Sequence, residues 1–399
     1  MKTPYPVQWA AGLASSIFPL FVKQEHNKII LTSFHGDGYR GNTRVLYEKL
    51  CRGNKLNPVW LSRNKNIVQN LKDQFGSNKA ELAHSFAGMR ALASASFILF
   101  THGTSDYPFL RLPRRANLIQ TYHGLPTKRG EYMRPNSNRR PGIFHRLLLQ
   151  YRFNPIDFFI SSSPFTTGIF SKRFNLPETR FLETGYPSYD HLINGNCEDD
   201  FIRKTWPDAP DYTSVILYSP TFRRLSKTRW YPFSDLDLDV IAGFLEKHNI
   251  LLMMRPHPNE KVDIRKFTVH SNRIVDAGQH KVEDIYRILL CTDAIITDYS
   301  SIYIEGLLKN IPSIFIPYDL DSYERGLPFP YHDLTPGDKV STQTEFLDAL
   351  QRALHDPNYL QTERDRVKNI FFSSADGNAT EKIIRFLEQQ VNSASVNSG

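Results

Sequence analysis

The sequence contains little cysteine, with three residues in a chain of 399. Cys51, Cys197 and Cys291 are far apart, and no pair has the spacing of a metal-binding motif. Their odd number argues against a disulfide framework, and Cys291 ends the apolar run 288–291, as a buried small hydrophobic residue would. We therefore predict a reducing cytoplasm and no disulfide framework.

A long uninterrupted apolar run is also missing. The nearest candidate, 3–22, carries no charge but is broken by Pro4, Pro6 and Pro19. These prolines exclude an ordinary transmembrane helix and the continuous apolar centre of a signal peptide. The segment could lie on a membrane surface, or it could pack as a helix on the protein's own body. In the first case its anchors would be Trp9, Phe18 and Phe21.

Acidic residues are outnumbered, 41 to 49, by lysine and arginine, and the formal net charge is +8. This balance favours an anionic partner such as nucleic acid, acidic lipid or a phosphorylated substrate. The excess is greatest in 111–152, where nine arginines and Lys128 accompany a single acid, Glu131. Because no nucleic-acid-binding module is recognisable, we predict a membrane surface or a phosphate polymer as the partner, and no nucleic acid.

Short β-rich runs alternate with longer helical patterns along the whole chain. This alternation predicts an α/β protein with doubly wound parallel sheets, covered by helices on both faces. The predicted strands are 29–32, 59–61, 97–100, 118–120, 158–160, 215–218, 250–253, 294–296 and 313–316. The predicted helices are 43–52, 80–95, 165–174, 238–247, 282–290, 302–308, 344–354 and 378–390.

A polar stretch at 189–213 indicates a link between two domains. We predict an N-terminal segment at 1–25, a first Rossmann-like domain at 26–188, a second at 214–390 and a frayed tail at 391–399. Ligands of such sheets bind beyond the carboxyl ends of the strands. Functional residues are therefore expected at the strand ends, in a central cleft that the two domains face.

In the second domain, the segment 297–301 follows a predicted strand and opens a predicted helix. It contains Thr297, Asp298, Ser300 and Ser301. A serine at the N-cap would leave backbone N–H groups and the positive end of the helix available to a phosphate. A plain helix cap without a ligand explains the same residues.

Two further strand ends in this domain carry basic residues. Arg255 and His257 belong to an Arg-Pro-His-Pro sequence, in which the prolines fix the loop and hold the histidine at the strand tip. Arg223 and Arg224 follow another strand, and their guanidinium groups suit bidentate contacts with phosphate. The alternatives are a core histidine bound to backbone and arginines exposed at the surface.

The first domain has similar strand ends. His123 follows the strand 118–120, and a histidine facing a cleft can take a proton from an attacking hydroxyl. Gly124 lets a ligand approach the backbone closely, and Lys128 and Arg129 come shortly after. Two other strand ends carry His35, Gly36 and Asn42 in one case and Thr101, His102 and Gly103 in the other.

Taken in order, these segments resemble the CDP-glycerol glycerophosphotransferase family, whose members prime and extend teichoic acids and some capsules. The resemblance extends over about 29–387. Its motifs are 33–36 with Asn42, 122–128, 219–223, 255–258, 297–301 and 318–320. Two departures are visible. Leu125 and Thr127 stand where the family's His-Gly-Thr-Pro-Leu-Lys motif has threonine and leucine, and the chain is short for a polymerase of this family.

The resemblance implies a GT-B-like fold and transfer of a polyol phosphate, in the first place glycerol phosphate, from CDP-glycerol to a hydroxyl of a lipid-linked or polymer acceptor, with release of CMP. It implies His123 as the base, and His257 as a second catalytic residue on the donor side. The predicted donor-side residues are Arg223, Arg255, Thr297, Asp298, Ser300 and Ser301, with Asp298 orienting its loop. The predicted acceptor-side residues are His35, Gly36, Asn42, Gly124, Lys128 and Arg129.

No cofactor or metal is predicted, since the CDP-polyol is a substrate and the acidic run 235–239 precedes a helix, where carboxylates favour the dipole. Mg²⁺ is possible but not indicated. The predicted location is the inner face of the cell membrane, with the chain attached peripherally. Three alternatives stay open: CDP-ribitol as the donor, a nucleotide-sugar GT-B glycosyltransferase using Glu305 or Asp319 to grip the sugar, and a non-catalytic basic binding protein.

Overall fold

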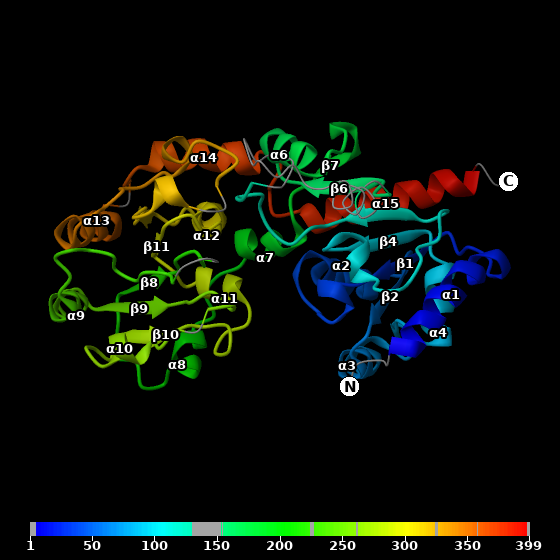
Figure 1. The fold of residues 1–399 in the computed structure, drawn as a ribbon, viewed down its shortest axis with the longest axis horizontal. Coiled ribbons are helices and arrows are strands. Elements are labelled where there is room, and N and C mark those ends of the chain that lie inside the picture. Colours follow the sequence, from blue (N-terminus) through cyan, green and yellow to red (C-terminus); the bar gives the residue numbers. More distant parts are fainter. Residues whose placement is uncertain are drawn as a thin grey trace. The chain divides into compact units, whose positions relative to one another are not determined.

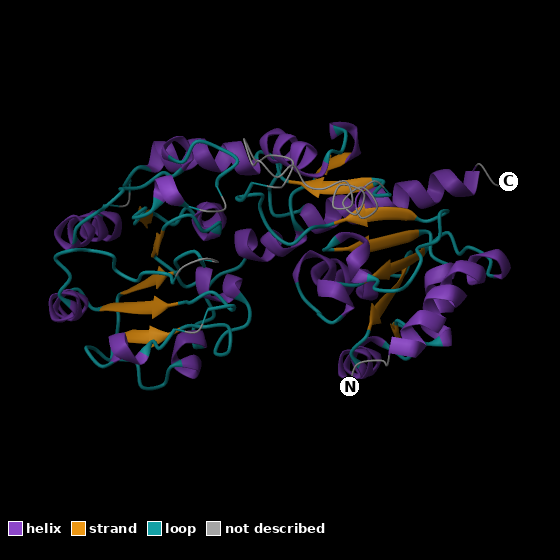
Figure 2. Cartoon of the chain, viewed as in Figure 1, coloured by secondary structure: helices purple, strands orange, loops and turns teal. Residues whose placement is uncertain are grey.

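The computed structural model describes residues 5–129, 153, 155–223, 227–260, 262–323, 326–356 and 358–396. The chain forms two compact units, each built on one parallel sheet (Figure 1). Unit 1 comprises Met1–Gly124, Gly130–Asp190 and Ser374–Gly399. Unit 2 comprises Leu125–Arg129 and His191–Ser373. Strands and helices alternate in both units, as the sequence predicts for an α/β protein (Figure 2).

The described part of unit 1 contains a seven-stranded sheet in the order β3-β2-β1-β4-β5-β6-β7, with every pair parallel. Its strands are β1 (Lys28–Leu31), β2 (Asn57–Ser62), β3 (Ala80–Leu82), β4 (Phe97–Phe100), β5 (Asn117–Gln120), β6 (Phe158–Ser161) and β7 (Phe181–Glu183). Its helices are α1 (Tyr5–Phe21), α2 (Gly41–Arg52), α3 (Lys65–Phe75), α4 (Phe86–Ala93), α6 (Pro164–Phe174), α7 (Pro187–Asn194, ending in unit 2) and α15 (Ala379–Val396). Short 3-10 turns are η1 (Phe34–Gly36), η2 (Gly103–Asp106) and η4 (Glu178–Arg180).

The described part of unit 2 contains a five-stranded parallel sheet in the order β10-β9-β8-β11-β12. Its strands are β8 (Ser214–Tyr218), β9 (Ile250–Met254), β10 (Ile274–Asp276), β11 (Ala294–Thr297) and β12 (Ser313–Phe315). Its helices are α8 (Phe201–Thr205), α9 (Leu238–Lys247), α10 (Arg265–Thr268), α11 (Ile285–Leu289), α12 (Ile302–Gly306), α13 (Gln343–His355) and α14 (Gln361–Phe372). Its 3-10 turns are η5 (Leu307–Lys309), η6 (Leu320–Ser322) and η7 (His332–Leu334).

Both sheets are built on strands that are apolar on both faces. All four residues of β4 and all five of β9 are buried, which is typical of parallel strands covered by helices on both sides. In unit 1, the core joins β4 to α4 and α1 through Ile98, Leu92 and Ala11. In unit 2, the core joins β9 to α9 and α13, with Ile241 and Leu350 among its buried side chains.

All nine predicted strands are present, each within two residues of its predicted bounds. The edge strands β3, β7 and β10 are not predicted, because each has only three residues and one of these is acidic, which leaves no apolar run to recognise. The predicted helix 80–95 is wrong at its start, since Ala80–Leu82 pairs with β2. The helix α4 begins only after Ser85, whose side chain accepts a hydrogen bond from the N–H of Gly88.

The structure divides the chain differently from the predicted domain ranges. The helix α15, predicted in the second domain, belongs to unit 1. Asp190 accepts hydrogen bonds from two backbone N–H groups of its first turn, at 2.8 and 2.7 Å. The predicted link 189–213 contains α8 and packs on unit 2, where Trp206 Nε1 donates to the carbonyl oxygen of Asp276 at 2.9 Å.

Cys197 and Cys291 form a disulfide within unit 2, which corrects the prediction of no disulfide. Cys291 is buried as predicted, but as a disulfide partner. Their Cα atoms lie 4.8 Å apart although 94 residues separate them along the chain. The sequence does not reveal this pair because its approach depends on how the segment before α8 packs beside the end of α11. Cys51 is free. The cysteine argument for a reducing cytoplasm is thereby lost, and the location of the chain stays a prediction.

The N-terminal segment forms α1, which contains Pro19 and packs on unit 1. Ala11 is buried in the core, and the ring of Phe18 lies 5.2 Å from that of Phe86 on α4. Trp9, predicted as an anchor, lies outside the described side chains. Among the described helices, none combines the length and the apolar character needed to cross a membrane.

Candidate active site

In each sheet the strand order turns once, between β1 and β4 in unit 1 and between β8 and β11 in unit 2. Ligands of doubly wound sheets bind beyond the carboxyl ends of the strands at such a switch point. Most of the predicted site residues follow these ends. One set follows β1, β4 and β5, and the other follows β8, β9 and β11.

Three histidines gather beyond the strand ends of unit 1. The rings of His102 and His123 are stacked in parallel, with centroids 4.0 Å apart, and the ring of His35 lies 4.7 Å from that of His102. Phe34 and Tyr122 flank the group, with ring centroids 4.8 Å from His102 and 4.1 Å from His123. The fold thus brings together three histidines that the sequence predicts at separate strand ends.

His123 is held in one tautomer. Its Nδ1 lies 3.2 Å from the carbonyl oxygen of Thr101, and a carbonyl only accepts, so Nδ1 carries the proton and Nε2 the lone pair. Burial of the ring and the neighbouring His102 lower the pKa of His123 to about 4. The residue as a whole is nevertheless exposed to solvent. A neutral imidazole with its Nε2 lone pair available can take a proton from a hydroxyl.

A buried aspartate that the sequence analysis does not single out completes the cluster. Asp106, at 1% exposure, accepts hydrogen bonds from the backbone N–H groups of His35, Thr101 and His102. The hydroxyl of Thr101 also donates to it at 2.9 Å. The sequence offers one indication of this role, because Asp106 follows the strand-end histidine His102 by four residues. It does not show that the loop turns the carboxylate back onto the strand end.

Asn42 supports the turn that carries His123. Its Nδ2 donates to the carbonyl oxygens of Thr121 and Tyr122 at 2.9 and 3.2 Å, and its Oδ1 accepts from the Ser188 hydroxyl at 2.7 Å. These bonds hold Tyr122 at a φ of +54°, in the left-handed region. Asn42 is buried, so its observed role is to fix the turn.

The two glycines predicted in this unit have different surroundings. At Gly36, with φ +78°, an added Cβ would lie 3.0 Å from the carbonyl oxygen of Asp106. At Gly124, with φ +153°, an added Cβ would meet no atom within 4 Å. The backbone conformation requires glycine at both positions, and the space beside Gly124, next to His123, is open.

The basic residues that follow His123 in sequence are placed in unit 2. Arg129 donates from its backbone N–H and its Nε to the carbonyl oxygens of Gly326 and Leu327, at 3.2 and 2.6 Å. Lys128 belongs to the same short segment of unit 2. Of the rest of the predicted basic stretch, residues 130–152 lie outside the described residues.

In unit 2, Arg223 lies at the centre of a buried ion network. Its Nε and Nη2 donate to the two carboxylate oxygens of Asp319, and Nη2 also donates to Asp298, all at 2.8 Å. Its Nη1 donates to the carbonyl oxygen of Thr221. Burial opposes the charge, but the bond to Asp319 and the charge of Asp298 outweigh it and raise the pKa of Arg223. The guanidinium therefore holds its own loops together, and its predicted contact with pyrophosphate stays a prediction. Arg224 lies outside the described residues.

Asp298 and Thr297 join the ends of β11 and β8. Oδ1 of Asp298 accepts from the backbone N–H groups of Thr221 and Tyr299, at 2.8 and 2.5 Å. The hydroxyl of Thr297 donates to the carbonyl oxygen of Ser219 at 2.7 Å. Asp298 is 2% exposed, so its carboxylate orients the loop from within.

His257 is held in the opposite tautomer to His123. The backbone N–H of Asn259 donates to its Nδ1 at 3.2 Å, so in the neutral ring the proton is on Nε2. The ring stacks on Phe222, with centroids 5.2 Å apart. A cavity of about 390 Å³ lies beside it, lined also by Glu260 and His280. This arrangement offers an N–H donor at a strand end.

Arg255, two residues before His257, is turned toward the protein. Its Nη1 donates to the carbonyl oxygens of Ala277 and Val282, at 2.6 and 2.9 Å. Burial lowers the pKa of Arg255 to about 10, with the charges of nearby acids opposing the shift. Its observed role is to anchor the loop after β10, and the predicted donor contact stays a prediction.

The turn before α12 keeps its hydroxyl groups near the strand end. Ser301 precedes the helix without a side-chain capping bond, and Ser300 Oγ lies 3.4 Å from the N–H of Ile302. Both serines are half-buried. The predicted helix is shorter than expected, because α12 passes into η5 after Gly306. Binding of phosphate at this turn stays a prediction.

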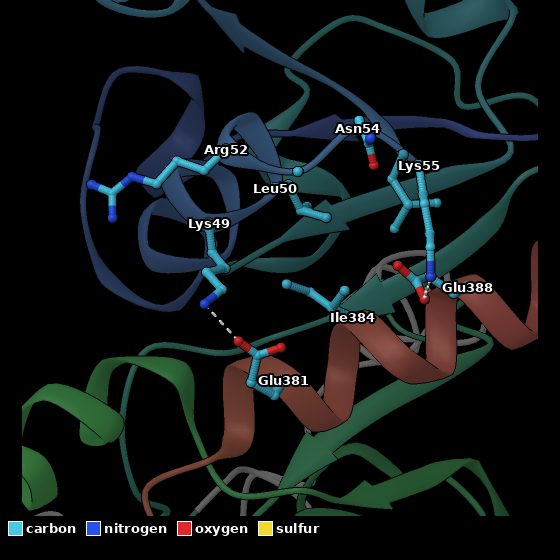
Figure 3. A pocket seen from close by; sticks show the side chains of 10 residues that line it. Lys49, Leu50, Arg52, Asn54, Lys55, Glu381, Ile384 and Glu388 are labelled. Carbon is cyan, nitrogen blue, oxygen red and sulfur yellow. Dashed lines mark hydrogen bonds and ion pairs between the residues drawn. The ribbon is translucent and has the colours of Figure 1, made fainter.

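A second cavity, of about 360 Å³, lies in unit 1 between the α2–β2 connection and α15 (Figure 3). Lys49 pairs with Glu381 at 2.7 Å and Lys55 with Glu388 at 3.1 Å across it, as the figure shows. The connection precedes the amino end of β2, whereas the histidines follow carboxyl ends of parallel strands. The cavity therefore lies at the opposite edge of the sheet and is separate from the histidine cluster.

Two parallel, doubly wound sheets with polar side chains beyond their strand ends define an α/β protein of the GT-B-like class. Within the described ranges, no three His, Cys, Asp or Glu side chains form a group that could hold a metal ion. The chain belongs to the CDP-glycerol:poly(glycerophosphate) glycerophosphotransferase family, whose family model matches residues 16–389.

The matches to curated relatives cover different shares of the relatives' own length. The teichoic acid glycerol-phosphate transferase of Staphylococcus aureus is 27% identical over 373 residues, covering 90% of this chain and 92% of the relative. The teichoic acid ribitol-phosphate primase of Bacillus spizizenii is 24% identical over 395 residues, covering 96% of each. The teichoic acid poly(glycerol phosphate) polymerase of Bacillus subtilis is 28% identical over 374 residues, but the match spans 48% of that protein.

Solved structures agree in fold. The wall teichoic acid polymerase TagF matches with a TM-score of 0.75 at 23% identity, covering 96% of this chain and 94% of that chain. The UDP-GlcNAc 2-epimerase of Neisseria meningitidis, bound to UDP-GlcNAc, matches with a TM-score of 0.57 at 12% identity, covering 90% of this chain and 99% of that chain. At these identities the likeness establishes the GT-B-like fold.

Proposed function

We propose that this chain transfers glycerol phosphate from CDP-glycerol to a hydroxyl of a lipid-linked or polymer acceptor, releasing CMP, in the synthesis of teichoic acid or capsule. Family membership supports this activity. A match over nearly the full length of the Staphylococcus aureus glycerol-phosphate transferase supports it as well. The observation that carries the proposal is His123, a neutral strand-end histidine whose Nδ1 is held and whose Nε2 is left basic.

The proposed step needs one base and little covalent chemistry. Nε2 of His123 takes the proton of the acceptor hydroxyl as its oxygen attacks the phosphorus that bears glycerol. The bond between that phosphorus and the bridging oxygen breaks, and CMP leaves with the bridging oxygen. Because phosphoryl transfer depends mainly on alignment and charge neutralisation, donors that face the phosphates would supply most of the remaining stabilisation.

Unit 2 offers such donors at its strand ends. The Nε2–H of His257 and the hydroxyl groups of Ser300 and Ser301 are the groups we propose for the pyrophosphate. Arg223 and Asp298 would shape the loop around them, since both are engaged with protein groups. A structure of the TagF variant H444N was determined with CDPG, which supports a CDP-polyol as the donor proposed here.

CDP-ribitol is the second candidate donor. The Bacillus spizizenii ribitol-phosphate primase matches 96% of this chain and 96% of its own length. Glycerol and ribitol differ in the number of hydroxyl groups beyond the phosphate, so the choice depends on contacts with the polyol and not on the pyrophosphate.

The test is CMP release and product mass with a defined lipid-linked acceptor and CDP-glycerol, CDP-ribitol or a UDP-sugar. We expect turnover with a CDP-polyol and none with the sugar nucleotide. His123→Ala should lower the rate of CMP release about a thousandfold while the dissociation constant for CDP-glycerol stays within a factor of about two, since the donor groups are in the other unit. Wild-type turnover by this variant would remove His123 as the base.

We also propose that α1 attaches the chain to an anionic membrane. Leu13, Ile17, Leu20 and Phe21 on this helix are 71%, 52%, 78% and 83% exposed, and Phe86 beside them is 69% exposed. The exposed residues Lys23, Arg90, Arg111, Arg114 and Arg115 belong to the same unit. Apolar side chains accompanied by cations suit a surface of anionic lipid, where both kinds of contact contribute.

Co-sedimentation with vesicles tests this attachment. The double variant Leu20→Gln, Phe21→Gln should bind vesicles containing phosphatidylglycerol several-fold more weakly than wild type. Both proteins should bind vesicles of pure phosphatidylcholine more weakly than vesicles containing phosphatidylglycerol. Val240→Gln, at a 49% exposed position on α9 of unit 2, is the matched control and should bind as wild type. Equal binding by the double variant would rule out α1 as the anchor.

A further inference from the structure

The carboxylate of Asp106 lies at the end of β4, 1% exposed, and does not reach the proposed reacting groups itself. We propose that Asp106 is a positioning residue for the transfer reaction, which holds the backbone carbonyl that fixes His123 and so keeps Nε2 of that ring free to act as the base. The inference rests on the proposed function of His123. It assigns a role to a residue outside the predicted site.

The carboxylate receives four hydrogen bonds from two strand ends. Oδ2 accepts from the backbone N–H of Thr101 at 2.6 Å, from the Thr101 hydroxyl at 2.9 Å and from the backbone N–H of His102 at 3.0 Å. Oδ1 accepts from the backbone N–H of His35 at 2.6 Å. Every one of these partners is a donor, so the position requires a group that only accepts.

The hydrogen bonds between Asp106 and Thr101 also fix the stacked rings of His102 and His123. Because the Thr101 hydroxyl donates to Asp106, it accepts from the backbone N–H of Phe34 at 3.1 Å and from Nδ1 of His102 at 2.8 Å. The carbonyl oxygen of Thr101 accepts from Nδ1 of His123 at 3.2 Å. Both rings are thus tied through Nδ1 to one residue, and Asp106 holds that residue by its N–H and its hydroxyl.

Asp106 also holds the strained turn after β1. His35 adopts a φ of +63°, which a residue with a side chain seldom does, and its N–H is bonded to Oδ1 of Asp106. Gln120 supports the same carbonyl of Thr101 through its Nε2 at 3.1 Å. The ends of β1, β4 and β5 are therefore joined around one carboxylate, and the base is placed by that junction.

Asp106→Asn makes a specific change. The amide keeps the size of the side chain but turns one acceptor into an N–H₂ group that faces donors, either at His35 or at Thr101 and His102. We expect kcat to fall about 10- to 100-fold, because a displacement of the base by about 1 Å costs that much. The KM for CDP-glycerol should change less than twofold, since the proposed donor groups lie in unit 2. Thr101→Val, which removes the hydroxyl link but keeps the carbonyl, should show a smaller loss of kcat.

Asp190→Asn is the matched control. Asp190 is also a unit 1 carboxylate that accepts backbone hydrogen bonds, here from the N–H groups of Ala379 and Thr380 at the start of α15 and not from a histidine turn. It should lower the melting temperature with kcat unchanged. A purely structural Asp106 predicts the same pattern for Asp106→Asn, so a variant with wild-type kcat after correction for folded fraction overturns the proposal.

A spectroscopic measurement separates this proposal from the proposed function. In protein labelled with ¹⁵N at histidine, the wild-type ring of His123, identified by loss of its signal in His123→Gln, should show a protonated Nδ1 and an unprotonated Nε2. Asp106→Asn should shift these two nitrogen signals toward each other. If wild type releases no CMP from either CDP-polyol, the proposed function fails while this measurement still tests the positioning. If wild type turns over and the signals and kcat do not move, the positioning fails alone.

Discussion

The two units share a parallel, doubly wound sheet topology, but the polar residues at their strand ends have different roles. In unit 1, three imidazole rings gather at the strand ends, and the carboxylate of Asp106 is buried beside them. In unit 2, Arg223 and Asp298 are both buried and form an ion pair, and Arg223 also pairs with Asp319. The first arrangement keeps a basic nitrogen available. The second fixes the shape of a loop whose neutral donors remain at the surface.

The two strand-end histidines show the same difference at atomic scale. A carbonyl oxygen meets Nδ1 of His123, and a backbone N–H meets Nδ1 of His257. The first contact leaves a lone pair on Nε2, and the second leaves a proton there. One ring is therefore suited to accept a proton from the acceptor, and the other to donate a hydrogen bond to phosphate. A backbone partner sets each role.

The largest expected effect comes from glutamine at His123. His123→Gln should lower kcat about a thousandfold, as much as alanine, because an amide cannot take up a proton. The measurement is single-turnover CMP release at pH 7.5. His26→Gln, at an exposed histidine just before β1, should leave the rate unchanged. A His123→Gln rate within tenfold of wild type would mean that the ring serves only to bind.

The buried network of unit 2 should respond in stability. Arg223→Met leaves the carboxylates of Asp298 and Asp319 without their cationic partner, which should cost about 3–5 kcal/mol of the free energy of unfolding. Chemical denaturation followed by circular dichroism measures it. Arg265→Met breaks an exposed pair with Asp263 in the same unit and should have no measurable effect. Equal stability of the two variants would show that the network is dispensable.

Glutamine at His257 should be milder than at His123. The side-chain amide can supply an N–H near the position of Nε2, so His257→Gln should retain affinity for CDP-glycerol within about threefold, while His257→Ala should lose about tenfold, the value of one hydrogen bond to a charged group. Isothermal titration calorimetry gives both constants. If Gln and Ala weaken binding equally, the ring contributes by stacking on Phe222 and not by donation.

The smallest effect concerns pH. With the pKa of His123 lowered to about 4, its ring stays neutral across pH 6–8, so kcat/KM should vary less than about twofold there from this group. Activity should fall only as the pH approaches 4. The unfolded chain binds a proton at this histidine near pH 6.5, before the folded chain does, so stability should fall between about pH 6.5 and 4. The lowered pKa would be contradicted if activity fell with a midpoint near pH 6.5 and substitution of each other histidine left that midpoint in place.

Much of this arrangement is predictable from the sequence because it depends on local patterns. Strands such as 97–100 are short apolar runs, and the polar residues that follow them fall at strand ends wherever the sheet is parallel. The histidines at 35, 102 and 123 are therefore foreseeable as neighbours. Their tautomers are not, because these depend on which backbone group a ring nitrogen meets after folding.

The partners of charged residues are the part that sequence does not reveal. Arg223 looks like a phosphate ligand after a strand, yet its carboxylates come from 75 and 96 residues further along the chain. The disulfide likewise joins cysteines that are 94 residues apart, so no local pattern indicates the pair. The three-residue edge strands β3, β7 and β10 each contain an acidic residue, so no apolar run marks them in the sequence. Long-range packing decides each of these features, and no local pattern encodes it.

The membership of α15 in unit 1 has a consequence for the order of folding during synthesis. Its first turn is bonded to Asp190, and Lys49 and Lys55 of the same unit pair with its acidic side chains. All of the segment His191–Ser373 is translated before this helix leaves the ribosome. Unit 2 can therefore complete its core first. Unit 1 is begun earlier, but the surface that α15 covers stays exposed until this last helix is synthesised.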